Sequence, residues 1–270
     1  MTALDAGGGT HVGRVRDSNE DHFFVGVLRK SLEARETNLA VTEAVEELTR
    51  LDADLLVVAD GVGGRHGGEH ASQSAVFTLA TYIARSASCH YDPDVEQEDE
   101  FLQRLERALE RSHSIVRDLG SGGRGPATTL TLAIVVGGRA YVAHAGDSRA
   151  YHFRRGRLRQ ITRDQTWANA LADAGVPEEE SAGGRLVNVL ASALGAQSMA
   201  PSISLVDLNE DDWLLLCTDG LTKHVSDEAI TATLGSATDA RDACDRLISA
   251  ALDGGGTDNI TVVAARVRPQ

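Results

Sequence analysis

The sequence is best read outward from ten residues, Leu55-Leu-Val-Val-Ala-Asp60-Gly61-Val-Gly-Gly64. A short, unbroken apolar run of this kind predicts a fully buried strand, and the glycines behind it predict an abrupt turn. Asp60 at that junction would be held rigidly, and it offers the hard oxygen that divalent cations prefer. Asp and Gly also favour turns for backbone reasons alone, so this stretch by itself indicates no more than a strand running into a turn.

Two further Asp residues in comparable settings change that interpretation. Asp219-Gly220 follows a second apolar run, and Asp258-Asn259 immediately precedes a third. Carboxylates clustered at strand ends, with no His or Cys beside them, suit Mg²⁺ or Mn²⁺ and not zinc. Two such ions roughly 3.5 to 4 Å apart can share a water, lower its pKa and orient it for in-line attack on phosphorus. Arg16 supplies a planar fork suited to two phosphate oxygens.

The composition excludes several classes of protein. The 270 residues are 42% hydrophobic and 24% charged, as in an ordinary globular chain, and no linker is visible, so we expect one domain over 1–270. A net charge of -14, from 40 acidic and 26 basic residues, argues against nucleic-acid partners and anionic membranes. We find neither a transmembrane stretch nor a signal peptide, which predicts a cytoplasmic protein.

The chain has three cysteines, Cys89, Cys217 and Cys244. They are odd in number and lack zinc-like spacing, so we expect them to be small buried apolar residues. None is followed by Arg six positions later, which is the spacing that a cysteine-dependent phosphatase requires. The sequence therefore favours a metal-dependent mechanism over a cysteine nucleophile.

The order of the expected elements predicts the fold class. Strands come in antiparallel runs and helices in pairs, which is not the alternating pattern of a doubly wound sheet. We therefore expect an α+β fold with two antiparallel sheets and helices outside them. Residues 29–52 are assigned to an insertion, and 164–200 are expected to be helical and mobile. The expected strands lie within 11–28 and at 55–60, 128–136, 139–145, 149–153, 157–161, 203–208, 213–218 and 260–267, and the expected helices at 67–84, 101–119, 226–234 and 240–252.

Six motifs follow one another along the chain: Arg16-Asp-Ser-Asn-Glu20-Asp21, Val58-Ala-Asp60-Gly61-Val-Gly-Gly, Ala127-Thr-Thr-Leu, Ala145-Gly146-Asp147-Ser148-Arg149, Thr218-Asp219-Gly220 and Gly256-Thr-Asp258-Asn259-Ile-Thr. In this order they resemble the metal-dependent type 2C Ser/Thr protein phosphatases, most closely the bacterial branch. The resemblance covers almost the whole chain. It implies a four-layer α-β-β-α sandwich with a binuclear metal centre between the two sheets.

The resemblance also implies roles for individual residues. Asp60 would bridge both metals, and the carbonyl of Gly61 would ligate one of them. Asp219 and Asp258 would complete the other metal site. Arg16 would bind the substrate phosphate, so that Arg16 and Asp60 form the expected catalytic pair.

Residues next to this set are given supporting roles. By the same resemblance, Glu20 and Asp21 would hold metal-bound waters. The turn that contains Asp147 is expected to be structural, and Thr128 and Thr129 are expected to be ordinary strand residues.

The sequence departs from the family pattern at three positions. Val62 stands where many eukaryotic relatives carry a His that protonates the leaving group, so that proton would come from a metal-bound water. Arg124 and Lys223 stand where Asp residues that help to hold a third metal are expected. Two cations in place of two carboxylates would repel a divalent ion, so we expect the third site to be absent. Arg124 and Lys223 would then occupy its space or contact the phosphoprotein, unless the Gly-rich loop is locally misaligned.

Together these observations predict a phosphomonoesterase that acts on phosphoserine and phosphothreonine in proteins. A bridging water activated by two divalent cations, Mn²⁺ or Mg²⁺, would attack phosphorus directly, with no phosphoenzyme. The expected partners are phosphoprotein substrates and a Ser/Thr protein kinase with the same targets. Residues 164–200 match the variable flap of the family, where substrate preference is expected.

Two alternative functions stay open. The chain could be a phosphatase dedicated to one phosphoserine regulator in a partner-switching pathway. It could also be a non-catalytic module that keeps the fold and binds phosphoproteins, although the intact Asp60, Asp219, Asp258 and Arg16 argue against this.

Overall fold

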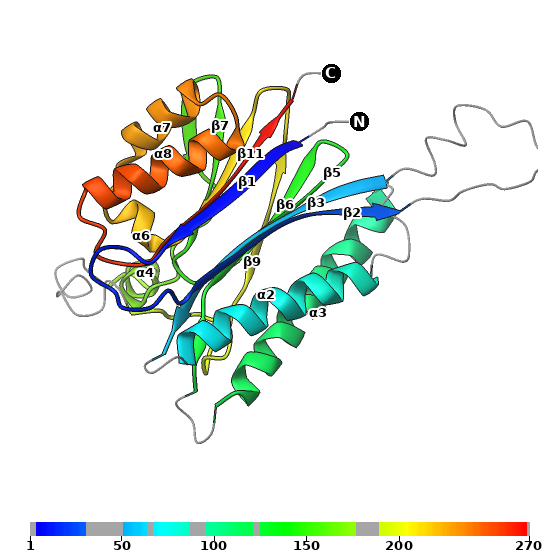
Figure 1. Ribbon diagram of the computed structural model, residues 1–270. Coiled ribbons are helices and arrows are strands. Elements are labelled where there is room, and N and C mark those ends of the chain that lie inside the picture. The colour runs from blue at the N-terminus through cyan, green and yellow to red at the C-terminus, as the bar shows by residue number, and fades with distance from the viewer. Residues whose placement is uncertain are drawn as a thin grey trace, which may run out of the picture.

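The computed structural model describes residues 4–30, 51–63, 67–86, 95–120, 125–176 and 189–268. Two antiparallel sheets lie face to face, and helices cover their outer faces (Figure 1). This arrangement confirms the predicted α+β sandwich of four layers, α-β-β-α.

Each sheet collects strands from distant parts of the sequence, and every neighbouring pair is antiparallel. The first sheet has the order β1 (Leu4–His11), β11 (Ile260–Val267), β10 (Trp213–Cys217), β7 (Arg149–Arg154) and β8 (Arg157–Gln160). The second has the order β2 (Asp21–Lys30), β3 (Leu51–Val62), β5 (Leu130–Val136), β6 (Arg139–Ala145) and β9 (Ser202–Asp207), with β4 (Ala127–Thr128) paired to the end of β3.

The helices pack on the outer faces of both sheets. The long helices α2 (Gly67–Ser86) and α3 (Val95–Asp118) run antiparallel across the second sheet, as expected (Figure 1). The shorter helices α7 (Asp227–Ser236) and α8 (Ala240–Asp253) cover the first sheet, after the one-turn helix α6 (Asp219–Thr222). The helix α4 (Trp167–Asp173) lies between β8 and β9 in sequence.

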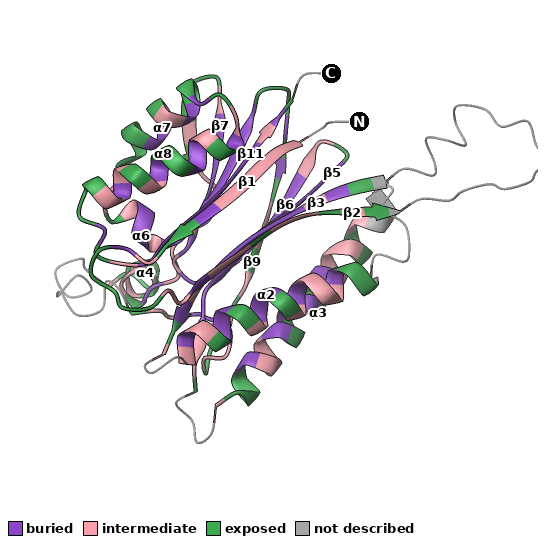
Figure 2. Ribbon diagram, in the orientation of Figure 1, coloured by how far each residue is buried: buried purple, intermediate pink, exposed green. Residues whose placement is uncertain are grey.

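The central strand β3 explains why its sequence is apolar without alternation. Leu55 and Val57 pack against the helices, whereas Leu56 and Val58 pack in the layer between the sheets. Successive side chains of a strand point to opposite faces, and here both faces are covered. The buried interior therefore forms three apolar clusters, one between the sheets and one beneath the helices on each side. The buried stretches of the strands and helices are coloured purple in Figure 2.

Several boundaries differ from those expected. The 29–52 insertion is shorter, because residues 29–30 continue β2 and residues 51–52 begin β3, in register across the hairpin; residues 31–50 lie outside the described residues. The 164–200 stretch is helical only over α4 within its described part, and α6 was not expected. Strand β1 was missed because three consecutive glycines weaken its apolar pattern. Gly8 is needed there, since a Cβ would collide with the ring of Phe23.

Two smaller expectations concern the membrane and the cysteines. Among the described helices, none combines the length and the apolar character that crossing a bilayer requires. Cys217 and Cys244 are buried and form no disulfide, as expected, while Cys89 lies outside the described residues.

Candidate metal centre

Strand ends from both sheets meet at one end of the sandwich. Asp21 at the start of β2 lies opposite Asp60 near the end of β3, because neighbouring antiparallel strands place a start beside an end. In the first sheet, β10 ends just before Asp219 and β11 begins just after Asp258. The topology therefore gathers carboxylates that are far apart in sequence. We call this cluster the acidic basin; its members are Asp21, Asp60, Asp147, Asp219 and Asp258.

Asp21 shows how strongly the basin disfavours negative charge. Burial is the main reason that the pKa of Asp21 rises to about 7, and the charges of Asp219 and Asp258 raise it as well. The hydroxyls of Thr261 and Thr218 donate to Oδ2 of Asp21 at 2.7 and 2.8 Å and oppose that rise. The two threonines thus fix the orientation of the Asp21 carboxylate through Oδ2, and Oδ1 has no hydrogen-bond partner among the described residues.

The pKa values of Asp60 and Asp147 are raised by the same causes, burial and neighbouring carboxylates. Burial raises the pKa of Asp60 well above its usual value, and the nearby charges of Asp21, Asp219 and Asp147 add to it. Burial likewise raises the pKa of Asp147 to about 7; Asp219 raises it further, and Lys223 opposes the change. Several carboxylates that raise one another's pKa form a site that attracts cations.

The backbone of Asp60 is fixed by Thr128 at the end of β4 and by Thr129, which lies just before β5. The amide of Asp60 donates to Oγ1 of Thr129, and its carbonyl accepts from Oγ1 of Thr128 and from the amide of Thr129, each at 2.9 Å. Thr129 in turn shares a 2.7 Å hydrogen bond with Ser148. The expectation that Thr128 and Thr129 are ordinary strand residues was therefore incomplete, because they position the strand end that carries Asp60.

The glycine after Asp60 is required by a close approach. The amide of Gly61 donates to the carbonyl of Glu20 at 3.2 Å, which joins the end of β3 to the loop before β2. A Cβ on Gly61 would collide with the backbone carbonyls of Gly68 and Glu20. Any larger residue would therefore displace the start of α2 or the loop that holds Glu20.

Asn259 fastens the loop that carries Arg16. Its side-chain amide donates to the carbonyls of Val12 and Ser18 at 2.8 and 2.9 Å, and its oxygen accepts from the amide of Glu20 at 2.9 Å. Because Asn259 is buried, these three bonds hold residues 12–20 against the start of β11. Asn259 belongs to one of the six sequence motifs, but its motif gives no sign of this positioning role.

Two cations lie against the acidic basin. The guanidinium of Arg16 forms a bidentate pair with Asp258, with Nε 2.8 Å from Oδ1 and Nη2 3.0 Å from Oδ2. The ammonium of Lys223 lies 2.6 Å from Oδ2 of Asp219 and 2.7 Å from Oδ2 of Asp258. Burial alone would raise the pKa of Asp258, but its bonds to Lys223 and Arg16 hold it below the usual value. Lys223 thus ties together two of the expected metal ligands.

The donor set of the basin suits a divalent cation. Oδ1 of Asp21 and Oδ1 of Asp219 are buried and have no hydrogen-bond partner among the described residues. Buried carboxylate oxygens without a partner are costly unless a cation neutralises them, and all-oxygen donors are those that Mg²⁺ and Mn²⁺ prefer. Within the described part of the chain, no three His, Cys, Asp or Glu side chains converge enough to hold one ion. Lys223 instead occupies the space between Asp219 and Asp258.

The remaining predicted positions are placed as follows. Glu20 and Asp21 flank the end of β3, while their predicted role in holding metal-bound waters stays a prediction. Val62 is 47% exposed at the rim of this end of the sandwich. Arg124 lies outside the described residues, so its predicted place next to Lys223 stays a prediction. Asp147 was expected in a structural turn near the site, but its place beside Asp219 in the acidic basin was missed, because only the fold brings the two together.

Comparisons with known proteins agree with this geometry. A model of the protein phosphatase 2C family matches residues 45–255. Serine/threonine protein phosphatase PstP of Mycobacterium tuberculosis is 36% identical over 226 residues, which make up 82% of this chain and 42% of PstP. Protein phosphatase PhpP of Streptococcus pneumoniae is 31% identical over 220 residues, 80% of this chain and 86% of PhpP. The chain thus spans less than half the length of its mycobacterial relative.

A solved structure gives the same picture in three dimensions. The catalytic domain of serine threonine protein phosphatase PstP, in complex with two manganese ions, superposes with a TM-score of 0.72 at 30% identity. The match covers 98% of this chain and 99% of that one. Both sheets and the helices outside them are therefore shared with a fold that holds two metal ions in that relative.

Proposed function

Because the chain belongs to the protein phosphatase 2C family, we propose that it hydrolyses phosphoserine and phosphothreonine in proteins with the help of two divalent cations. The acidic basin carries this proposal, since its five Asp residues lie together at one end of the sandwich, where burial and neighbouring carboxylates raise the pKa of Asp21, Asp60 and Asp147. Asp60, the carbonyl of Gly61, Asp219 and Asp258 would hold the ions, once the Lys223 ammonium leaves its place between Asp219 and Asp258. When bound, two Mg²⁺ or Mn²⁺ ions supply an activated water and stabilise charge on the phosphoryl oxygens, so no phosphoenzyme is needed.

The chain's own residues position the reacting groups. Thr128 and Thr129 fix the backbone of Asp60, and Asn259 fixes the loop that carries Arg16. The Arg16 side chain is about half exposed, so its fork can exchange Asp258 for two phosphate oxygens when substrate arrives. Glu20 and Asp21 would orient water beside Asp60. Since Val62 has no titratable group, we expect water to supply the leaving-group proton.

The expected partners of this activity are phosphoproteins in the cytoplasm and a Ser/Thr protein kinase that modifies the same targets. Residues 164–200, part of which lies outside the described residues, are the segment that we propose for substrate preference. The relatives named as Ser/Thr protein phosphatases support this substrate class.

Turnover of a phosphothreonine peptide tests the proposal. We expect phosphate release only when Mn²⁺ or Mg²⁺ is present, complete loss with EDTA, and recovery when Mn²⁺ is restored. Ion binding should also stabilise the fold, by about 2.7 kcal/mol at a Mn²⁺ concentration 100 times its Kd. Stabilisation by Mn²⁺ without turnover would favour the phosphoprotein-binding module, and no effect of Mn²⁺ on either readout would contradict the metal centre itself.

We also propose that Lys223 supplies positive charge at the position where a third cation would otherwise bind. Its ammonium is already within 2.7 Å of Asp219 and Asp258, and its charge opposes the raised pKa of Asp147. Burial would lower the pKa of Lys223, but Asp219 and Asp258 raise it, so the ammonium stays protonated. A tethered cation of this kind would limit the chain to two metal ions.

Counting bound Mn²⁺ tests this role without measuring activity. Free Mn²⁺ can be followed by electron paramagnetic resonance during titration of the wild type and of Lys223→Asp. We expect the variant to bind one further Mn²⁺ per chain, because a carboxylate replaces the ammonium beside Asp147 and Asp219. Lys223→Met separates loss of charge from gain of a ligand, and it should tighten Mn²⁺ binding without adding a site. Superimposable titrations of all three proteins would contradict the role of Lys223.

A further inference from the structure

One side of the sandwich is strongly basic, although the whole chain has a net charge of -14. Strands β8 and β9 are the edges of the two sheets on this side. A groove of about 720 Å³ lies between them. The segment 149–163, which includes β7, β8, the turn between them and the three residues after β8, contains six Arg residues and no Asp or Glu. These arginines thus concentrate positive charge beside the edge strands of both sheets.

Three of these arginines differ from their neighbours in having no counter-ion. Arg149, Arg154 and Arg163 are paired with Asp164, Asp212 and Asp173, respectively. Arg155, Arg157 and Arg159 are exposed, and no ion pair to them is found within the described ranges. We call these three residues the arginine row. In a chain rich in acidic residues, three exposed and uncompensated arginines in a row form a charged surface that is available to a partner.

The register of the hairpin turns this row toward the groove. Arg157 lies opposite Arg154 and Arg159 lies opposite His152, and directly opposed residues share one face of a sheet. That face of β7 also carries Ala150, which packs in the layer between the sheets. Arg157 and Arg159 therefore project from β8 toward β9, where Leu205 is 43% exposed on the opposite wall.

The described residues that line the groove include no acidic side chain that is free to neutralise the arginine row. Asp207 is the acidic member of the described lining, and its carboxylate is paired with Arg139 at 2.8 Å. The charge of Arg159 also lowers the pKa of His152, after burial, which is the larger cause. The positive field of the row thus extends into the groove.

The turn that joins β7 to β8 adds an independent sign of function. Its two central residues, Arg155 and Gly156, have φ angles of 50° and 77°. A two-residue hairpin of this shape favours Asn or Gly at both positions, because other side chains crowd the backbone when φ is positive. Arg155 is therefore placed against its local backbone preference, which is typical of residues kept for a binding role.

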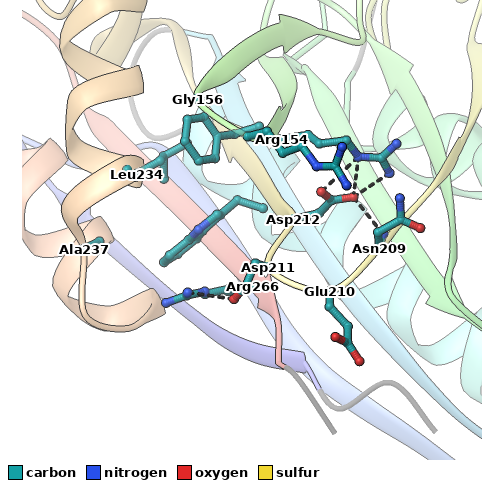
Figure 3. Close-up of a pocket in the computed structure, with 13 residues that line it drawn as sticks. Arg154, Gly156, Asn209, Glu210, Asp211, Asp212, Leu234, Ala237 and Arg266 are labelled. Atoms are coloured by element: carbon teal, nitrogen blue, oxygen red, sulfur yellow. Dashed lines mark hydrogen bonds and ion pairs between the residues drawn. The ribbon is translucent and has the colours of Figure 1, made fainter.

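A neighbouring hollow on the other side of the same turn shares Arg155 with the groove, but its other two arginines, Arg154 and Arg266, are paired. It measures about 400 Å³, and Figure 3 shows Arg154 and Asn209 converging on Asp212 within it. Arg266 there is paired with Asp211 at 2.8 Å and stacks over the ring of Trp213. Arg154 and Arg266 thus serve the fold, whereas Arg157 and Arg159 line the groove between β8 and β9 and not this hollow, which makes the groove the surface open to a partner.

We propose that this groove docks an extended, acidic segment of a partner protein. Edge strands expose unpaired backbone N–H and C=O groups, which an extended peptide can use, and alternate acidic side chains would reach the arginine row. Charge repulsion from the rest of the chain would disfavour such a segment elsewhere on the surface. Strand β8 leads toward Asp164, whose charge is felt at Asp147 in the acidic basin. Recruitment of a substrate by this route rests on the proposed phosphatase function, whereas docking itself does not.

Binding of a probe peptide tests the groove independently of catalysis. A fluorescein-labelled peptide of alternating Glu and Val should bind the wild type, and the same peptide with Lys for Glu should not. Reversing two charges in Arg157→Glu/Arg159→Glu should weaken binding by about 10-fold or more, because close charge pairs are lost and replaced by repulsion. The matched control is Arg107→Glu/Arg111→Glu on α3, which changes the net charge of the chain equally at exposed sites. It should leave the affinity within about 3-fold, since distant exposed charges are screened.

Two further measurements separate loss of peptide docking from loss of folding or of catalysis. Arg155→Asn suits the positive φ, so it should not reduce the melting temperature, yet it should weaken the probe peptide. Turnover of a short phosphothreonine peptide by Arg157→Glu/Arg159→Glu should equal that of the wild type. Equal losses of affinity in the groove and control variants would overturn the proposal. Displacement of the probe by single-stranded DNA or by phosphatidylserine vesicles at equal charge would also overturn it, because the groove would then be a general polyanion surface.

Discussion

Asp60→Asn should lower kcat/KM for a phosphothreonine peptide by about 10³-fold or more, an effect comparable to that of losing a key charge-stabilising group. Asp60 is the carboxylate expected to contact both metal ions, and its backbone is fixed by Thr128 and Thr129. The substitution preserves size and shape, so lost activity would report lost charge. Initial rates at saturating Mn²⁺, together with the Mn²⁺ stoichiometry, measure the effect.

The same substitution should raise stability in the metal-free protein. Burial and neighbouring carboxylates raise the pKa of Asp60 in the folded state, so its ionised form costs stability at neutral pH, and a neutral Asn removes that cost. Asp54→Asn is the matched control, because Asp54 lies on β3 with a pKa that burial raises to about 6, outside the basin. It should keep full activity. Equal turnover by Asp60→Asn and the wild type would contradict the proposed mechanism.

Asp212→Asn should lower the free energy of unfolding by about 3 kcal/mol, at the lower end for breaking a buried ion pair. Asp212 is 2% exposed and accepts hydrogen bonds from Arg154, His152 and the amide of Asn209. The variant would leave Arg154 without its counter-ion at the end of β7. Arg154 keeps access to water, which limits the loss. Urea unfolding at pH 7 measures the difference.

The pH dependence gives this prediction a second readout. Burial would raise the pKa of Asp212, but its bonds to Arg154, Asn209 and His152 hold the pKa below its usual value of 3.8. A lowered folded-state pKa stabilises the protein above that usual value, and the contribution is lost as the pH falls through the folded-state pKa. The gap between wild type and variant should therefore shrink in acid.

Asp211→Asn is the matched control for Asp212. Asp211 is adjacent, more than half exposed and paired with Arg266, and its φ of 66° is one that Asn adopts readily. Exposed ion pairs contribute about 0.2 to 1 kcal/mol, so this variant should change stability by no more than that. Equal losses in the two variants would show that the buried carboxylate has no special role.

The sequence predicted well those elements whose pattern is set by burial on a sheet. Strand β3 appears as a continuous apolar run because both of its faces are covered, and α2 repeats at helical spacing because only one face is buried. Strand β1 could not be predicted in the same way, because its glycines are there to admit the ring of Phe23 and the backbone of α8. Such close approaches leave no periodic signal.

The sequence predicted only part of the site, again because contacts between distant residues leave no local pattern. Asp60, Asp219 and Asp258 stand next to strand ends, and a strand end is visible in the sequence. Asp147 stands in a turn that is also explained by local geometry, so nothing in the sequence places it beside Asp219. The positioning bonds of Thr129 and Asn259 span 69 and 239 positions, which no local pattern encodes.

The sequence alone therefore determined the fold class and the oxygen-rich chemistry of the strand end at Asp60, and its resemblance to a family led us to expect Lys223 in place of a carboxylate. It could do so because residue type and hydrophobic period are local properties. The tertiary structure alone decided which carboxylates meet, that Lys223 lies between Asp219 and Asp258, and that the arginine row faces an open pair of sheet edges. Those facts depend on strand order and register, which bring together groups that the chain itself keeps far apart.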